Sequence, residues 1–303
     1  MHRIATFIEH HFWIFFLAGI IGGLIFPQYS ESLRFLLQPA LMFMLFLLFL
    51  KLKLGDIAKS ISDYKLMSYL AVLFLLVIPI ITYAIFVFID PTIALGFLLL
   101  AAVPPGSSTP ALTDLVNGNV VLSMSILIIC SLLAPFTIPL LFSYATPAGV
   151  SIDAMEMFVT LTTLIFIPLI LSYPIKKIFP KKISQSVRYF AAINVVIIFF
   201  FVYTAIGTEQ KFIMDNFDQV IGQLVLLYIF FGALHVIGYF AGTGRNKADK
   251  IAIIVSNSYR NNGMGIVLAA TFFSPTIVIL MVLSEIPWST LLGPFKKIVP
   301  YLK

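Results

Sequence analysis

The amino-acid sequence predicts an all-α membrane protein that crosses the bilayer ten times, in two inverted five-helix repeats whose fourth and ninth helices are broken and cross each other. Three observations predict this fold: the composition, the spacing of the apolar segments, and two interruptions at corresponding positions of the two halves. Apolar residues make up 60% of the 303 residues and charged residues only 11%, against about 25% charged in a soluble domain. The composition therefore excludes an ordinary soluble domain and predicts apolar helices of about 20 residues.

Ten apolar segments follow one another along the chain. They cover residues 12–26, 33–50, 66–89, 92–116, 120–144, 155–175, 187–206, 220–241, 250–273 and 276–295. The first segment lacks a small-residue cleavage site and is followed by further spans, so we expect a membrane helix there rather than a signal peptide.

The basic residues gather on one side of the predicted membrane. With ten spans both termini lie on the same side, and the segments on that side hold every lysine and arginine except Arg34, Lys211 and Arg260. Cytoplasmic loops carry such an excess of basic residues. We therefore expect a multi-pass protein of the plasma (inner) membrane with both termini in the cytoplasm. The net charge of +6 belongs to these short loops, so the expected partner is the lipid bilayer and not nucleic acid.

The segments divide into five before residue 145 and five after it, which predicts a first repeat over residues 1–145 and a second over residues 146–303. Because five is odd, the second repeat enters the membrane from the side opposite to the first. Inverted repeats of this kind occur in secondary transporters, whose sites lie where discontinuous helices of the two repeats meet. If segment four is broken, segment nine is expected to be broken too.

Segment four is interrupted by the sequence VPPGSSTP at residues 103–110. Its three prolines remove backbone donors and Gly106 adds conformational freedom, so a continuous helix is not expected. Non-helical backbone survives at membrane depth only where it is packed in protein or lines a wet cavity. The hydroxyls of Ser107, Ser108 and Thr109 are therefore candidate ligands for a solute or an ion. The alternative is a kinked helix without a ligand.

Segment nine is interrupted by the sequence SNSYRNNGMG at residues 256–265. Its asparagines compete with the helix for hydrogen bonds, and its glycines cost the helix backbone entropy. The pairing of this break with the first one is the feature that points to a transporter site. Candidate ligands are Ser256, Asn257, Asn261 and Asn262, together with Ser123 of segment five, although serine in a membrane helix is more often a packing residue.

Two charged residues are predicted near the middle of the membrane. Arg260 lies about 10 residues into segment nine, which is roughly 15 Å of helix, and Glu285 lies at a similar depth in segment ten. A charged side chain there costs about 2.5–3.5 kcal/mol on insertion scales, so each must face a cavity or a partner. Two interpretations stay open: a structural Arg260–Glu285 ion pair, or an Arg260 that attracts an anionic solute while Glu285 neutralises it or carries protons.

Other polar or special residues receive structural interpretations. Cys130 is the only cysteine and the four histidines lack metal-ligand spacing, so no metal and no cofactor is expected. His235 stands alone on an apolar span and is interpreted as hydrogen-bonded structure, and Pro79 as a helix kink. Paired aspartates, a Gly-x-Ser-Gly with histidine and a His-Glu-x-x-His are missing from the sequence, which argues against an intramembrane enzyme.

Three stretches resemble the bile acid:sodium symporter family (BASS/SBF-like), which is related to arsenite-efflux permeases. They are AAVPPGSSTPALTDLVNGNVVLS at residues 101–123, LHVIGYFAG at 234–242 and SNSYRNNGMGIVLA at 256–269. The ten-span count agrees with the family. The resemblance implies a core of spans three to five and eight to ten in which the broken spans cross, and a panel of spans one, two, six and seven. It also implies alternating access by movement of the panel against the core.

The chain departs from the family at the positions that match its sodium ligands. The family has a Ser-Asn pair where this chain has Thr109-Pro110, and two hydroxyls on segment five, of which Ser123 is retained and Leu127 is not. Its glutamate and glutamine on segment nine fall on Ser256 and Arg260. Sodium prefers oxygen ligands and is repelled by a fixed cation, so coupling through the usual two sodium sites is not expected. Arsenite is not favoured either, because the cysteine that the arsenite branch carries on segment four is missing here.

The leading hypothesis is therefore a secondary transporter of a small organic anion, with Arg260 as the anion contact. Transport can be coupled to Na⁺, coupled to H⁺ carried by Glu285, or uncoupled. A non-transporting receptor on the same fold and an auxin-carrier-type permease are the alternatives.

Overall fold

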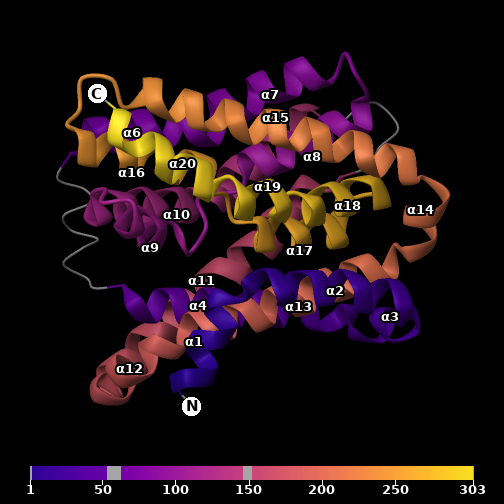
Figure 1. The fold of residues 1–303 in the computed structure, drawn as a ribbon, viewed down its shortest axis with the longest axis horizontal. Helices are drawn as coiled ribbons and strands as arrows, with labels where there is room; N and C mark the ends of the chain where they lie inside the picture. Colours follow the sequence, from indigo (N-terminus) through magenta and orange to yellow (C-terminus); the bar gives the residue numbers. More distant parts are fainter. Residues whose placement is uncertain (1, 53–62, 146–151, 303) are drawn as a thin grey trace.

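The computed structural model describes residues 2–52, 63–145 and 152–302, and these ranges are helical apart from turns and one isolated β-bridge. Figure 1 shows the helices in two layers. We call the lower layer the panel; it holds α1–α4, α12 and α13, and α11 joins it by packing against α4 as well as against α10 of the upper layer. We call the upper layer the core; it holds α6–α10 and α15–α20.

The panel elements are α1 (His2–His10), α2 (Phe12–Ile25), η1 (Pro27–Tyr29), α3 (Ser30–Leu33), η2 (Arg34–Leu36), α4 (Leu37–Lys51), α11 (Ala154–Ile178), α12 (Pro180–Ser186), η4 (Val187–Tyr189) and α13 (Phe190–Thr208). The core elements are α6 (Tyr64–Val72), η3 (Leu73–Val77), α7 (Ile78–Phe86), α8 (Pro91–Ala102), α9 (Thr109–Leu115), α10 (Val120–Ala145), α15 (Phe217–Ala241), α16 (Lys247–Ser258), α17 (Asn262–Phe272), α18 (Pro275–Leu283), α19 (Glu285–Thr290), α20 (Leu292–Ile298) and η5 (Val299–Tyr301). The short α14 (Gln210–Asp215) connects the two layers.

Seven helical stretches of the described chain are long and apolar enough to cross a membrane. They are Pro27–Lys51, Tyr64–Phe86, Val120–Ala145, Ala154–Ile178, Pro180–Thr208, Phe217–Ala241 and Pro275–Tyr301. Three shorter apolar helices, α2, α8 and α17, fall in the first, fourth and ninth predicted segments. The expected all-α polytopic membrane protein is confirmed. Ten crossings and an inverted repeat stay predictions.

The half-helices α8 and α16 begin at side-chain caps remote from the breaks. Asp90 Oδ1 accepts a hydrogen bond from the Ile93 N–H at 2.8 Å, and Pro91 occupies the first position of α8, where an N–H has no helical partner. Asn246 Oδ1 caps α16 by accepting from the Asp249 N–H at 2.9 Å. Both half-helices then run 12 residues into the core before they end at a break.

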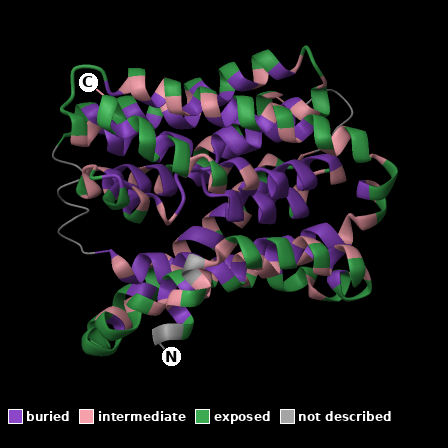
Figure 2. Ribbon diagram, viewed as in Figure 1, coloured by how far each residue is buried: buried purple, intermediate pink, exposed green. Residues whose placement is uncertain are grey.

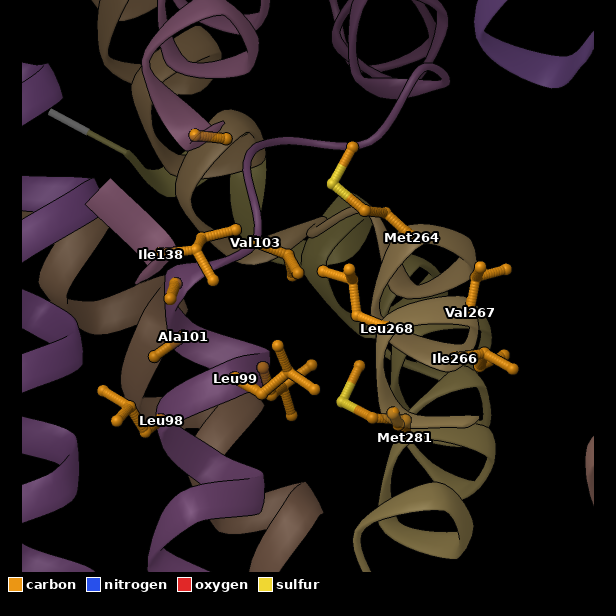
Figure 3. Close-up of a cluster of buried hydrophobic side chains, with 14 of the residues drawn as sticks. Leu98, Leu99, Ala101, Val103, Ile138, Met264, Ile266, Val267, Leu268 and Met281 are labelled. Atoms are coloured by element: carbon orange, nitrogen blue, oxygen red, sulfur yellow. The ribbon is translucent and has the colours of Figure 1, made fainter. Parts of the chain in front are cut away.

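The parts of α8 and α16 next to the breaks and most of α17 are deeply buried, whereas α9 is partly exposed. Every residue of α17 from Asn262 to Ala270 is buried. Figure 2 shows buried residues through the inner helices of the core and along the core-facing side of the panel, with large exposed areas on the outer helices. Figure 3 shows side chains of α8, such as Leu99, packed against those of α17 and α18, such as Leu268 and Met281. Exposed apolar side chains on the periphery suit a surface that faces lipid.

Polar contacts join the loops at each end of the molecule. At one end, four contacts tie together loops that the sequence assigns to the side of the termini: Lys176 Nζ with Leu52 O, Arg245 with Asp63 (3.1 Å), Asn119 Nδ2 with Asp249 Oδ1 (2.7 Å) and Lys247 Nζ with Pro300 O (2.9 Å). At the other end, Tyr83 Oη donates to Ala145 O at 2.6 Å. The four contacts at the first end join segments that the sequence predicts on one side of the membrane.

Candidate functional site

The two breaks pair with each other through their backbones. The Gly106 N–H donates to Tyr259 O and the Asn261 N–H donates to Pro104 O, both at 2.8 Å, which makes the antiparallel bridge between Pro105 and Arg260. Each break thereby satisfies polar groups of the other, as backbone at membrane depth requires. Segment four is interrupted as the sequence predicts, because α8 ends at Ala102 and α9 begins at Thr109. A ligand at this break stays a prediction.

The close approach of the two breaks requires glycine at position 106. A Cβ placed there would lie 3.0 Å from Arg260 O and 3.4 Å from Tyr259 O, which are main-chain atoms of the partner break. Real Cβ atoms rarely come so close to backbone. The sequence signal of Gly106 is therefore explained by packing of backbone on backbone.

The second break is shorter than the sequence predicts. Only Tyr259, Arg260 and Asn261 separate α16 from α17, whereas the interrupted stretch was expected over residues 256–265. Asn261 Oδ1 accepts from the Met264 N–H at 3.1 Å and so starts α17 as its N-cap. The glycines of this stretch lie inside α17, where their lack of a side chain serves packing.

Arg260 is 1% exposed and is surrounded by oxygen atoms from three core elements. Its Nη2 donates to Asn257 Oδ1 at 3.0 Å, and its Nη1 donates to Val103 O and to Phe74 O, each at 3.4 Å. Its guanidinium carbon also lies 5.5 Å from the centre of the Phe74 ring, within the range of a cation–π interaction. We call this set of three acceptor oxygens the Arg260 cage.

Phe74 O is available to Arg260 because of a proline five residues further along. Residues 73–77 form a π-helical turn, η3, in which the Ile78 N–H donates to Leu73 O. The next donor that could reach the Phe74 carbonyl belongs to residue 79, which is a proline and has no N–H. Pro79 is thus more than the helix kink that the sequence indicated.

The Arg260–Glu285 ion pair, one of the two interpretations that the sequence left open, is not formed in the structure. The ion pairs of the described residues are Arg34–Glu31 and Arg245–Asp63. The guanidinium of Arg260 is directed to α16, α8 and η3, and none of these elements carries Glu285, which is the first residue of α19 and is 3% exposed. Both charged residues are therefore buried, without each other as partners.

The hydroxyl candidates separate into two groups. Ser123 of α10 and Ser256 of α16 are fully buried, and their Oγ atoms lie 3.3 Å apart. Thr109 Oγ1 donates to Gly106 O at 2.9 Å and so closes the first break. Ser107 and Ser108 are partly exposed turn residues of that break.

The amide candidates of the second break also differ in their partners. Asn257 Nδ2 donates to Leu234 O of α15 at 2.7 Å, while its Oδ1 belongs to the Arg260 cage. Asn262, the first residue of α17, is 2% exposed, and neither Oδ1 nor Nδ2 has a hydrogen-bond partner among the described residues. A buried amide without partners is costly unless a ligand or water completes it.

Asn262 stands where the core meets the panel. A Cβ at the adjacent Gly263 would lie 3.1 Å from Met44 Cε of α4 and 3.4 Å from Phe201 Cε2 of α13. The amino end of α17 therefore abuts two panel helices, and the helix dipole favours a negative charge there. This end of α17 is the best candidate for binding an anionic group.

A cavity of about 510 Å³ lies between panel and core at the other end of α17. Its lining consists of Glu31, Arg34, Phe35, Leu37, Gln38, Ala270 and Thr271. Arg34 donates to Ala270 O and so links the panel to the last turn of α17. Burial raises the pKa of the nearby Glu209, which follows α13, whereas Arg34 lowers this pKa and Glu31 raises it.

These features define a class of protein: a polytopic membrane protein whose two discontinuous core helices meet at their breaks, the arrangement that holds solute and ion sites in secondary transporters. The chain belongs to the SBF-like CPA transporter family, whose profile matches residues 10–287. The resemblance to bile acid:sodium symporters that the motifs indicated is thereby confirmed.

Three relatives are each 26% identical to the chain. An uncharacterized sodium-dependent transporter of Bacillus subtilis, YocS, matches over 189 residues, 60% of this chain and 57% of the relative. The uncharacterized protein YbaS of the same bacterium matches over 207 residues, 64% of each chain. The probable chloroplastic sodium/metabolite cotransporter BASS1 of rice, Oryza sativa subsp. japonica, matches over 186 residues, 59% of this chain and 44% of the relative. The matched region is thus less than two thirds of each relative.

Proposed function

We propose that the protein is a secondary transporter that moves a small organic anion across the plasma (inner) membrane by alternating access. The observation that carries this proposal is the buried, unpartnered amide of Asn262 at the amino end of α17, where the core meets the panel. Half-helix amino ends of this kind bind anionic substrate groups in secondary transporters. Membership of a transporter family supports the same class of activity.

The topology that we propose has ten crossings in two inverted repeats, with both termini in the cytoplasm. The seven long helices, the shorter α2 and the two broken segments together make ten. The contacts among the loops support this count, because they tie together loops of the basic side at one end. The antiparallel bridge between the breaks supports the inverted relation of the two halves.

In the proposed site, an anionic group of the solute accepts hydrogen bonds from the Asn262 side-chain amide and from the Gly263 N–H. The N–H groups of Asn262, Met264 and Gly265 already donate to Arg260 O, Asn261 Oδ1 and Asn261 O. Arg260 contributes its positive charge next to this site, because it lies two positions before Asn262 in the chain and its carbonyl oxygen accepts a hydrogen bond from the Asn262 N–H at 3.0 Å. The panel helices α4 and α13 cover the site at Met44 and Phe201. Movement of the panel away from Gly263 would expose the site to one side of the membrane.

The coupling ion is proposed to differ from that of the relatives named as sodium-dependent. The residues that match the family's sodium ligands include the hydroxyl pair Ser123–Ser256 and Thr109 but no carboxylate, and Arg260 adds a fixed positive charge. Glu285 is a buried carboxyl that can carry a proton. We therefore propose coupling to protons or uncoupled transport in place of the usual two sodium sites.

The experiment is flux of a panel of organic anions into proteoliposomes, after a thermal-shift screen that selects anions which raise the unfolding temperature. We expect at least one carboxylate to bind and to be transported, and Asn262→Ala to lose both. Asn216→Ala is the matched control. Asn216 precedes α15, and its Nδ2 donates to Phe212 O of α14, away from the proposed site. If the protein transports only neutral solutes, the proposed anionic substrate is wrong. If an anion binds but is not transported, the protein is a receptor and not a transporter.

A further inference from the structure

We propose that Arg260 is a resident cation: its guanidinium permanently fills a position in the proposed transport site that is built to hold an exchangeable cation. The position is the Arg260 cage, made of Phe74 O, Val103 O and Asn257 Oδ1. The inference rests on the proposed function in that it assigns the cage to a transport site. It goes beyond that function by giving Arg260 a role in ion coupling.

The cage has the chemistry of a cation site. Two of its three ligands are backbone carbonyls that lack a helical donor, Phe74 O because residue 79 is a proline and Val103 O because α8 ends at Ala102, before two prolines. The third ligand is the carbonyl oxygen of an amide side chain. Oxygen atoms of unwound backbone are the groups that coordinate small cations in broken-helix transporters.

Two helix ends add to the negative potential at this point. Both α8 and α16 are 12 residues long and end at the breaks, Val103 is the residue that follows α8, and Arg260 follows α16 by two positions. The carbonyl end of a helix carries partial negative charge and favours a cation. The amino end of α17, which favours an anion, lies immediately beyond Arg260 in the chain.

The charge of Arg260 has no carboxylate to compensate it within ion-pair distance among the described residues. Both Nη atoms are used by the cage, and the side chain is 1% exposed. An arginine that served as the direct anion contact would instead present these donors to the panel side. The geometry therefore assigns to Arg260 the part of the cation and leaves the direct anion contacts to Asn262 and α17.

A covalently attached cation cannot leave with the solute. It supplies the positive charge beside the anion site in every state of the transport cycle, so no dissolved cation has to bind at this position. An uncharged residue with an oxygen at position 260 would leave the cage oxygens without a cation. Such a cage is open to Na⁺, whose preference for oxygen ligands suits it.

The test is thermal unfolding of the full-length purified protein in equal concentrations of NaCl, KCl and choline chloride. For Arg260→Gln we expect a lower Tm than wild type in KCl and in choline chloride, and a saturable rise of a few degrees that only NaCl produces. Arg260→Lys keeps the charge and is expected to show no sodium response beyond that of wild type. Arg260→Met removes charge and oxygen alike, and is expected to lose Tm without recovery in NaCl.

The measured quantity is the sodium response of each variant minus that of wild type, which removes any contribution from other positions. Equal Tm of Arg260→Gln in all three salts would overturn the proposal, and so would the same sodium response in Arg260→Met. If Arg260→Gln does not fold, the Arg260→Lys variant decides. A folded lysine variant without a sodium response supports the proposal, because the charge alone then fills the cage. A lysine variant that does not fold contradicts it, because the hydrogen-bond geometry of the guanidinium and not its charge is then required. The readout needs no solute, so it stays valid if no anion is transported.

Discussion

The two breaks in the core differ in what they contribute to the site. The first, between α8 and α9, contributes backbone: Val103 O faces Arg260, and Pro104 O and Gly106 N–H pair with the second break. The second, between α16 and α17, contributes the guanidinium of Arg260 and the start of α17. Prolines expose carbonyls in one half of the chain, and a cation from the other half occupies them. Neither break makes the site alone, and mutations can test each contribution.

The largest effect is expected from Gly106→Val, which attacks the contact between the two breaks. The new side chain would meet Arg260 O at 3.0 Å and displace the backbone bridge. Overpacking costs about 1–3 kcal/mol and each lost hydrogen bond about 1 kcal/mol, so we expect a loss of roughly 3–5 kcal/mol in the free energy of unfolding, measured by denaturation in detergent. Gly222→Val is the control, because a Cβ at Gly222 meets nothing within 4 Å. Equal stability of the two variants would show that the bridge does not hold the breaks together.

A smaller effect is expected when side chains next to each break are compared. Asn257→Ala leaves Arg260 Nη2 without its acceptor and removes the side-chain hydrogen bond to Leu234 O. An unsatisfied buried group costs about 1–3 kcal/mol and a lost hydrogen bond about 1 kcal/mol, so a loss of roughly 2–4 kcal/mol follows. Thr109→Val removes one hydrogen bond to Gly106 O, worth about 1 kcal/mol. Unfolding temperatures of both variants measure the difference. A Thr109→Val variant that is the less stable of the two would reverse our view that the first break acts mainly through backbone.

The same comparison explains what the sequence could predict. Three prolines and a glycine within seven residues predict the first break, because together they remove three backbone donors and add conformational freedom. A single proline is not sufficient, since α10 continues through Pro135 and α11 through Pro168. The second break has no proline, and its asparagines and glycines also occur at helix ends. The sequence therefore predicts an interruption over residues 256–265, whereas only residues 259–261 lie outside the two helices. Arg260 could be found as a buried charge. Its partners could not, because the availability of Phe74 O depends on the hydrogen-bond register of another helix and on Pro79, residues that only folding brings near position 260.

Two glycines of α17 test the contact between core and panel separately from the packing inside the core. A Cβ at Gly265 would lie 2.0 Å from Met281 Cε of α18, within the core, whereas one at Gly263 faces Met44 and Phe201 of the panel. We expect Gly265→Ala to cost about 1–2 kcal/mol of unfolding free energy. Gly263→Ala should stay within about 0.5 kcal/mol of wild type, because the helix gains from alanine what the contact loses. It should instead slow transport in proteoliposomes, since the panel must move past this residue. Normal flux in Gly263→Ala would contradict a moving panel at this contact.

The smallest effect concerns a second arginine at the end of a broken helix. Arg34 also donates to a terminal carbonyl, Ala270 O of α17, but its side chain is 45% exposed and Glu31 lies 4.0 Å away. Glu209 belongs to the same group of charges, and its pKa is raised mainly by burial, is lowered by Arg34 and is raised again by Glu31. An acid whose pKa is higher in the folded state binds its proton more tightly there. Its contribution to stability is therefore complete below the unfolded pKa and is lost as the pH rises through the folded pKa.

Glu209→Gln should remove this pH dependence. Wild type is expected to lose a small part of its stability as the pH rises above 4.5, the ordinary pKa of the group, and the variant is expected to lose less. Because Glu209 is partly exposed, screening by solvent keeps the difference small. Unfolding temperatures measured from acid to neutral pH test this, with Glu156→Gln at the start of α11 as a control for the loss of one carboxylate. If the unfolding temperatures of both variants depend on pH in the same way, burial does not raise the pKa of Glu209 enough to affect stability. The difference between Arg34 and Arg260 would then rest only on the geometry of their hydrogen bonds.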